Sequence, residues 1–173
     1  MKKIYTASTV LLFSFLLSAM PSFAQTPDTK LYTIIPYSHD LASMFSRPPQ
    51  NLKSTTLNKK DVLVIHSLFD ECIKQYNSKT DTTEYRNFIT GNQPAHQHYF
   101  IDPRHSYFKQ IVPIDSNGIK LAWVNCFCSK GLNNKSQYRS MIMMAEDGGL
   151  CFFNFMVNLT TGKYYDMHVN NFE

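Results

Sequence analysis

Two cysteines one residue apart, Cys126 and Cys128 in the stretch AWVNCFC, have the spacing that most directly suggests chemistry. Such a pair can be a redox couple, half of a metal site, two disulfide halves, or two small core residues. A reactive thiol needs exposure and a lowered pKa, and a structural zinc site needs four converging ligands. A buried strand provides neither, so the pattern favours buried free thiols. The alternative is a long-range disulfide, for which Cys72 is one candidate partner; Cys151 is expected two strands away from Cys126.

The segment HQHYFIDPRH contains a second candidate set, formed by His96, His98, Asp102 and His105. In an extended chain His96 and His98 share one face, and the other two residues follow across a turn. Imidazole and carboxylate donors at this spacing can bind Zn, Cu or Ni. A solvated loop is the other interpretation, because the sequence has no His-Glu-x-x-His helix. A metal-binding protein or metal-dependent enzyme is therefore the alternative hypothesis for function.

Familiar catalytic motifs are missing from the sequence. It contains no Gly-x-Ser-x-Gly elbow and no glycine-rich phosphate loop. The paired carboxylates Asp70-Glu71 are expected on the solvent side of a helix, and Glu146-Asp147 lie in a turn that selects Asp and Gly. Neither pair is placed for acid–base catalysis. We therefore expect a non-enzymatic protein, with no catalytic residue and no cofactor.

The N-terminal residues 1–24 have the pattern of a secretory signal peptide. Lys2 and Lys3 precede an apolar stretch that ends before Pro21, and Ser22-Phe23-Ala24 leaves small residues before Gln25. The stretch is short for a membrane span, so we expect export without a stable membrane anchor after cleavage. Without those two lysines, 15 basic residues face 13 acidic ones, a net charge of +2. That balance gives no reason to expect nucleic-acid binding.

Residues 25–57 have no sustained hydrophobic period and contain four prolines, which predicts an extended arm with a candidate edge strand at 31–37. Residues 58–77 place apolar side chains at alternating steps of three and four, which predicts an amphipathic helix. Asn58 is its expected N-cap, and Asp61 lies in the first turn. Alternating apolar segments separated by Asn-Gly and Asp-Gly turns follow. The expected strands are 107–114, 119–128, 137–145, 150–159 and 163–169.

One helix followed by an antiparallel meander of four or five strands predicts an α+β domain over residues 58–173, in which a curled sheet wraps the helix. This order of elements resembles that of cystatin-like and NTF2-like domains. The stretches YFKQIVPIDSNGIKLAWVNCFC, DGGLCFFNFMVNL and YYDMHVN also resemble a group of small exported bacterial proteins without assigned activity. The resemblance implies a cystatin-like or NTF2-like roll and brings no catalytic motif.

The strand alternation leaves a large apolar set on the face away from the helix. Its expected members are Trp123, Phe127, Ile142, Met144, Phe152, Met156 and Tyr164. So much apolar surface needs a cover, which can be the arm, a second copy of the chain, or a ligand. A sugar or peptide site would use Trp123, Phe127, Phe152 and Tyr164. We therefore predict an exported binding or structural domain that uses this face or the arm, with an unknown protein or small ligand as its partner.

Overall fold

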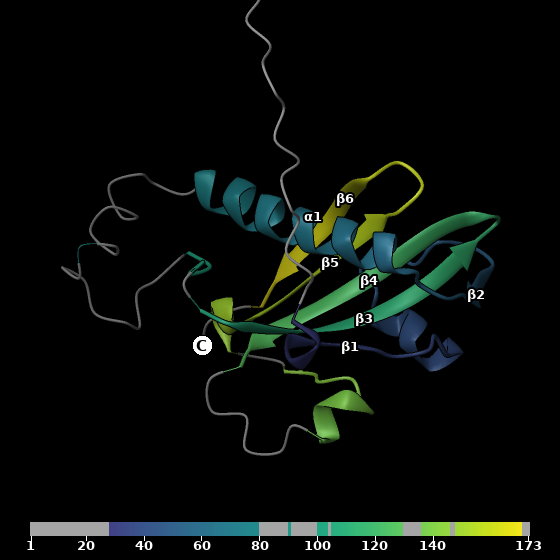
Figure 1. Cartoon of the computed structure of the whole chain (residues 1–173), viewed down its shortest axis with the longest axis horizontal. Coiled ribbons are helices and arrows are strands. Elements are labelled where there is room, and N and C mark those ends of the chain that lie inside the picture. Colours follow the sequence, from purple (N-terminus) through teal and green to yellow (C-terminus); the bar gives the residue numbers. More distant parts are fainter. Residues whose placement is uncertain are drawn as a thin grey trace, which may run out of the picture.

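The computed structural model describes residues 28–79, 90, 100–103, 105–129, 136–145 and 148–170. It shows an α+β architecture with one main helix on a sheet of six strands, as Figure 1 shows. The helix α1 spans Lys59–Ser78. The strands are β1 (Tyr32–Ile34), β2 (Leu52–Ser54), β3 (Tyr107–Ser116), β4 (Ile119–Cys128), β5 (Phe152–Asn158) and β6 (Lys163–Val169). Short 3-10 helices are η1 (Thr29–Leu31), η2 (His39–Met44), η4 (Gln137–Arg139) and η5 (Gly149–Cys151).

The predicted helix is confirmed, including its start. The Asn58 side chain accepts a hydrogen bond from the backbone N–H of Asp61, and the Asp61 carboxylate accepts one from the backbone N–H of Asn58. This capping box satisfies two of the donors that a helix start leaves unpaired. The expected apolar stripe is the buried face: Val62, Ile65, Leu68, Phe69, Cys72 and Ile73.

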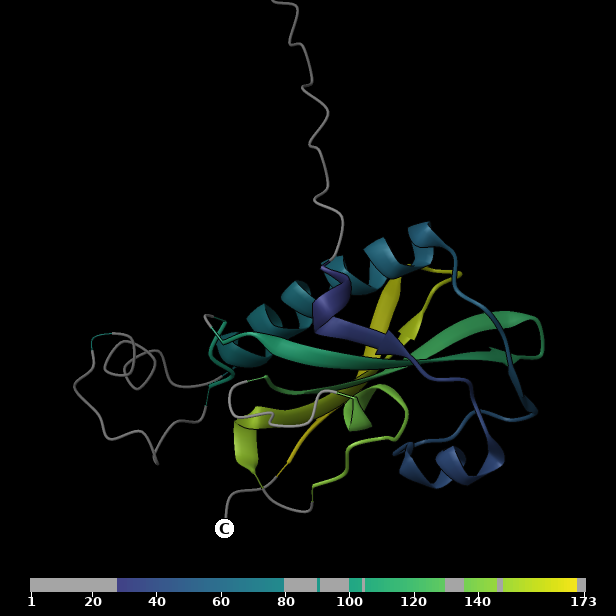
Figure 2. The same ribbon diagram turned by 60° about the horizontal axis from the view of Figure 1, so that its bottom comes forward.

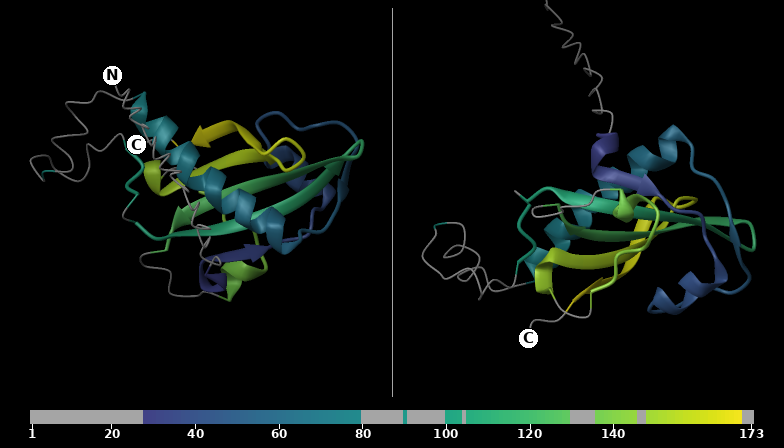
Figure 3. Two further views of the ribbon diagram at one scale, coloured as in Figure 1. Left: turned by 45° about the horizontal axis from the view of Figure 1, so that its top comes forward. Right: turned by 90° about the horizontal axis from the view of Figure 1, so that it is seen from below.

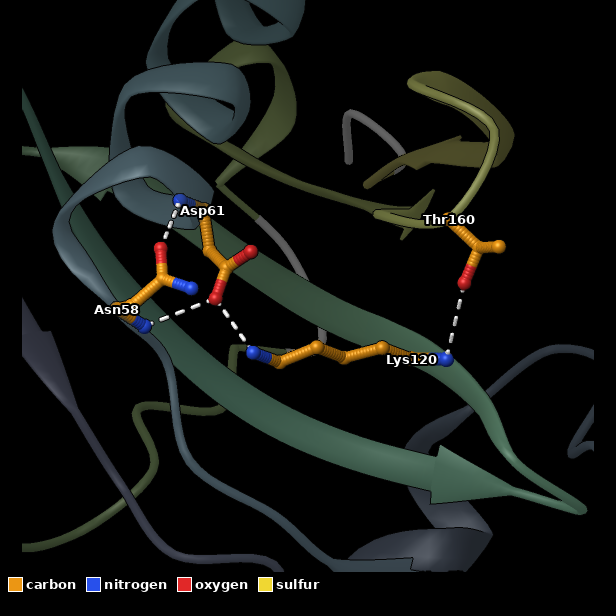
Figure 4. Close-up of polar contacts among 4 residues, drawn as sticks. All are labelled: Asn58, Asp61, Lys120 and Thr160. Carbon is orange, nitrogen blue, oxygen red and sulfur yellow. Dashed lines mark hydrogen bonds and ion pairs between the residues drawn. The ribbon is translucent and has the colours of Figure 1, made fainter.

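The capping box also joins α1 to the sheet. Figure 4 shows the Lys120 ammonium of β4 donating to the Asp61 carboxylate, while the backbone N–H of Lys120 donates to the Thr160 hydroxyl at 3.3 Å. Burial disfavours the charged form of Asp61, but the hydrogen bonds from Lys120 and the Asn58 backbone lower its pKa overall. One lysine therefore connects the start of the helix, the start of β4 and the β5–β6 turn.

Strands β3 to β6 form the expected antiparallel meander, and the arm makes the sheet mixed. The strand order is β1-β3-β4-β5-β6, with β1 parallel to β3 and β2 antiparallel to the far end of β3. The β3–β4 hairpin turns through Asn117 and Gly118, both with positive φ, as a two-residue hairpin loop requires. The expected edge strand at 31–37 is thus confirmed as β1, whereas β2 was not predicted.

The predicted strand at 137–145 is wrong. This segment forms η4 and an irregular stretch, and β5 pairs directly with β4. Because no strand lies between them, the end of β4 is next to the start of β5, and Cys128 forms a disulfide with Cys151. Cys72 and Cys126 are buried free thiols. The pairing of Cys72 with Cys126 or Cys128 is therefore wrong, because the sequence suggested one strand too many between the true partners.

Two apolar clusters lie on opposite faces of the sheet. Figure 2 shows α1 on one side, and η2 with the 136–145 segment on the other. The helix-side cluster contains Ala122, Val124 and Cys126 of β4, as the alternation predicted. The second cluster joins Tyr37, Leu41, Phe45 and other arm residues to Trp123 and Met156 of the sheet.

The arm is thus a cover for the helix-free face. The two views of Figure 3 show α1 crossing the strands on one face, and η2 and η4 lying over the other.

One assignment of the strand alternation is wrong. Tyr164 pairs with Val157, packs with the helix-side cluster and donates a hydrogen bond to Gln75 of α1. It therefore faces the helix rather than the arm.

Candidate ligand-binding cavity on the helix-free face

A row of four polar side chains crosses the otherwise apolar helix-free face. Gln110 pairs with Asn125, Asn125 with Asn154, and Asn154 with His168, on β3, β4, β5 and β6 in turn. Side chains directly opposite each other on neighbouring strands share one face of the sheet. Their exposure rises along the row, from 0% for Gln110 and 6% for Asn125 to half-buried Asn154 and exposed His168. The row therefore runs from the core to the surface.

The exposed end of the row depends on an irregularity in β6. Met156 pairs with Tyr165, but Asn154 pairs with His168, so β6 has one extra residue over this interval. Asp166, within it, has a φ of 56°. A β-bulge of this kind changes which side of the strand the following residues face. Here it places His168 on the helix-free face beside Asn154.

The buried end of the row holds the 136–145 segment against the sheet. The Gln110 amide nitrogen donates to the carbonyls of Tyr138 and Met141, at 2.7 Å each, and its carbonyl accepts from the backbone N–H of Met143 at 2.8 Å. The Asn125 amide nitrogen donates to Gln110 and to the Met143 carbonyl. These bonds replace the strand ladder that the segment lacks, which explains how it stays ordered without being a strand.

A cavity of about 300 Å³ opens where the row reaches the surface. Its floor is formed by Asn154 and His168 of the sheet. Three segments distant in sequence form the walls: the end of η2 with the residues after it, the end of the 136–145 segment, and the end of β6. The full lining is Ser43, Met44, Phe45, Ser46, Met144, Ala145, Asn154, His168 and Asn170.

Specific contacts fix the walls. The Arg47 guanidinium of the arm lies 3.7 Å from the Asp166 carboxylate of β6. The Asn170 amide donates to the Ala145 carbonyl at 2.6 Å. On the same face of the sheet, the Trp123 indole N–H donates to the side-chain amide oxygen of Asn154 at 3.3 Å. The cavity is therefore a feature of packed elements rather than of a single loop.

The four aromatic residues expected to bind a ligand do not come together on an open surface. Trp123 and Phe127 are 2% and 0% exposed, and Phe127 packs against the half-buried ring of Phe152. Tyr164 lies on the opposite face of the sheet. An aromatic platform built from these residues is wrong as a geometry, because the arm and the 136–145 segment cover it. Trp123 reaches the cavity only through its hydrogen bond to Asn154.

The histidine cluster is described only in part. His96 and His98 lie outside the described residues. Asp102 is buried, and its carboxylate lies 3.7 Å from the exposed imidazole of His105. Within the described part of the chain, no group of three or more His, Cys, Asp or Glu side chains is placed to hold a metal ion. The Asp102–His105 pair is the part of the predicted site that the structure places together.

A second group of ionisable side chains lies under α1. Lys109, 6% exposed, pairs with Cys126 across β3 and β4, and its ammonium lies 4.0 Å from the centre of the Phe69 ring. Burial raises the pKa of Cys126 well above its usual value and that of Cys72 to about 12, and it lowers the pKa of Lys109. These shifts keep both thiols protonated at neutral pH, so neither is an activated nucleophile.

A larger hollow of about 640 Å³ lies between β1 and the start of α1. Two of its polar side chains already bind the backbone: Asn58 caps the helix, and Asp28 accepts a hydrogen bond from the Lys30 N–H. The cavity on the helix-free face is the better candidate, because its polar side chains come from three separate segments, the arm, β5 and β6, and line a common space.

The fold and the cavity together define an α+β domain with an open, arm-walled cavity on the sheet face opposite its helix. In comparisons of this chain with protein-family models, curated proteins and solved structures, none of the three gave a match. Among the described helices, none is long and apolar enough to cross a membrane. Sequence reasoning missed Met44, Asn154, His168 and Asn170 as cavity residues, because four separate segments build the cavity.

Proposed function

We propose that this chain is an exported, non-enzymatic binding domain whose ligand occupies the cavity between the arm and strands β5 and β6. The observation that carries the proposal is the polar row, which continues from a fully paired buried network to side chains that line an open cavity. Buried polar networks fix geometry, and convergent polar groups in a cavity give a ligand its orientation.

A small ligand fits this site better than a protein partner or a second copy of the chain. The arm and the 136–145 segment already bury the apolar centre of the helix-free face. What they leave open is a cavity of about 300 Å³, the size of a small-molecule site. Among the nine lining residues, His168 is the one titratable side chain. That lining supports binding over acid–base catalysis, which needs paired acid and base groups.

Export and the finer fold belong to the same proposal. The signal-peptide pattern of residues 1–24 and the Cys128–Cys151 disulfide both suit an oxidising compartment. One helix across a four-stranded antiparallel meander supports a cystatin-like or NTF2-like roll. The alternative, a metal site that uses His96, His98, Asp102 and His105, has the Asp102–His105 pair in its support.

Trp123 makes the proposal testable without knowing the ligand, because it is the sole tryptophan of the chain and bonds to the cavity floor. We would measure Trp123 fluorescence and thermal unfolding with a panel of amino acids, short peptides, mono- and disaccharides, Cu(I) and Zn(II). A ligand present at a free concentration of one hundred times its Kd raises the free energy of unfolding by about 2.7 kcal/mol. For a domain of this size that raises Tm by about 5 to 10 °C.

Two serine variants provide the control. Ser46→Phe places a ring at the cavity wall, whereas Ser54→Phe places one on exposed β2, away from the cavity. We expect the ligand response to disappear in the first and persist in the second. A panel in which no ligand changes Tm or fluorescence, or in which both variants respond like the parent protein, would contradict the proposal.

A further inference from the structure

The cavity lining contains an unusual set of donors. Met44 at the end of η2, Met144 in the 136–145 segment and His168 in β6 all line the same space. They are separated by long stretches of sequence, and each belongs to a different wall or to the floor. Two residues with thioether side chains and one with an imidazole therefore line a common cavity of about 300 Å³.

Thioether sulfur is a soft ligand, and soft ligands select Cu(I) among the metal ions common in biology. Calcium and magnesium need several oxygen ligands, usually carboxylates, and structural zinc sites use thiolates, imidazoles and carboxylates. No carboxylate and no thiol is among the nine lining residues. The donor set is neutral apart from the titratable imidazole. It therefore suits a soft, singly charged ion and discriminates against hard divalent cations.

The position of Met144 supports a binding role. Its side chain is 59% exposed, so the thioether is accessible from solvent. The backbone before it is nevertheless fixed: Met143 donates its N–H to Gln110 and accepts at its carbonyl from Asn125, both at 2.8 Å. The residue after it, Ala145, is held by Asn170. The structure thus presents an exposed thioether from a firmly held backbone, as a preorganised ligand requires.

The other two donors are held in a similar way. The β6 bulge puts His168 beside Asn154, whose carbonyl oxygen is occupied by the Trp123 indole. Met44 ends η2, which is closed by the hydrogen bond from the Phe45 N–H to the Ala42 carbonyl and joined to β6 by the Arg47–Asp166 pair. These contacts hold the backbone segments that carry Met44 and His168.

We propose that Met44, Met144 and His168 bind a Cu(I) ion in the cavity. This inference rests on the proposed function, since it names the ligand class for the same site. The buried thiols do not compete for the ion in the folded protein, because Cys72 and Cys126 are both 0% exposed. The ion would be held by two sulfurs and one nitrogen, with Asn154 and Asn170 providing polar surroundings.

The test is a Cu(I) titration of the purified protein against the chromophoric chelator bicinchoninate, under nitrogen with ascorbate as the reductant. Ascorbate keeps copper as Cu(I) and leaves the Cys128–Cys151 disulfide intact. We expect one Cu(I) per chain, and weakening of its affinity by at least about tenfold in Met44→Leu, Met144→Leu and His168→Gln. Leucine keeps the volume and removes the sulfur, so these variants should fold, as circular dichroism and Tm would verify.

Met141→Leu is the matched control. Met141 is 61% exposed, belongs to the same segment as Met144 and is not among the cavity residues. We expect its Cu(I) affinity to equal that of the parent protein. Equal affinities in all the variants, or loss of binding only in a His96→Ala/His98→Ala protein, would overturn the assignment.

The outcomes also separate this inference from the proposed function. If a sugar, peptide or amino acid binds in a manner that Ser46→Phe abolishes while Cu(I) does not bind, the copper assignment is wrong and the binding function stands. If neither Cu(I) nor any other ligand of the panel binds, both are wrong.

Discussion

His66 is expected to make the fold sensitive to mild acid. It lies on α1, its ring meets Tyr32 of β1 edge-on at 5.5 Å between centroids, and its Nε2 is buried without a hydrogen-bond partner. Burial, and then the charge of Lys109, lower the pKa of His66 from 6.5 to about 4. Protonation would place a second positive charge beside Lys109 in a site with little water.

The size of the effect follows from proton linkage. A pKa of about 4 in the folded state, against 6.5 unfolded, means that the unfolded chain binds the proton first as the pH falls. The free energy of unfolding is therefore at its full value above pH 6.5 and decreases as the pH falls from 6.5 toward 4. Each pKa unit corresponds to 1.36 kcal/mol, which gives an upper bound of about 3 kcal/mol. Because the ring is only half-buried, solvent screening reduces the expected loss to about 2 kcal/mol.

The assay is urea unfolding at several pH values between 7 and 4.5, on the parent protein and on His66→Phe. The phenylalanine variant should lose the decrease in stability over this range, since it has no proton to bind. His39→Phe, which changes an exposed histidine on η2, should retain it. Asp61 does not contribute to the decrease between pH 7 and 4.5, because its pKa is lowered from 3.8 and its contribution to the free energy of unfolding is lost only at more acidic pH. A decrease of equal size in His66→Phe would refute the reasoning.

Three further predictions concern the disulfide, the buried Lys109 and the polar row. Replacing Cys128 and Cys151 by alanine should lower the unfolding free energy by about 3 kcal/mol, since the disulfide closes a loop of 23 residues; an unchanged urea midpoint would show that the bond is not formed. Lys109→Met should raise stability at pH 7 by about 1 kcal/mol, because a buried ammonium is costly and its contact with an aromatic ring offsets only part of that cost. The stability advantage of the variant over the parent protein should shrink as the pH rises toward 10.5, since the pKa of Lys109 is lowered from 10.5 in the folded protein and the parent loses its buried charge first. Gln110→Leu should lower the free energy of unfolding by about 2 kcal/mol and expose the 136–145 segment to proteolysis, because backbone groups of that segment lose their hydrogen-bond partners. Unchanged protease resistance would mean that other contacts hold the segment.

The helix and the hairpin strands are predictable from sequence because their signals are local. Asn58 and Asp61 form a capping box three residues apart, and the buried stripe follows the helical period. The Asn117-Gly118 turn is equally local, since its positive φ values suit those residue types.

The errors came from interactions between distant residues. Residues 137–145 have enough apolar character for a strand, but the side chains of Gln110 and Asn125 satisfy the backbone there instead. No pattern within the segment could show this. The false strand then separated Cys151 from the end of β4 and hid the disulfide with Cys128.

The cavity could not be predicted for a related reason. Strict alternation along β6 would place His168 on the same side as Tyr164, which faces the helix. The bulge near Asp166 reverses this and brings His168 beside Asn154. The polar residue between Trp123 and Phe127 was visible as an interruption of an apolar strand, and Asn125 is indeed part of the row that leads to the cavity.

NMR of the protein labelled with ¹³C at the methionine methyl groups can show whether the cavity on the helix-free face is the binding site. Met44 and Met144 line the cavity and Met141 does not, so their methyl signals report on the site and on its surroundings separately. Substitution of each by leucine assigns the signals. We expect Cu(I), or any other ligand of the panel that binds, to shift the Met44 and Met144 methyl signals and to leave that of Met141 in place. Binding that leaves the Met44 and Met144 signals unmoved, or a full panel without any shift, would contradict it.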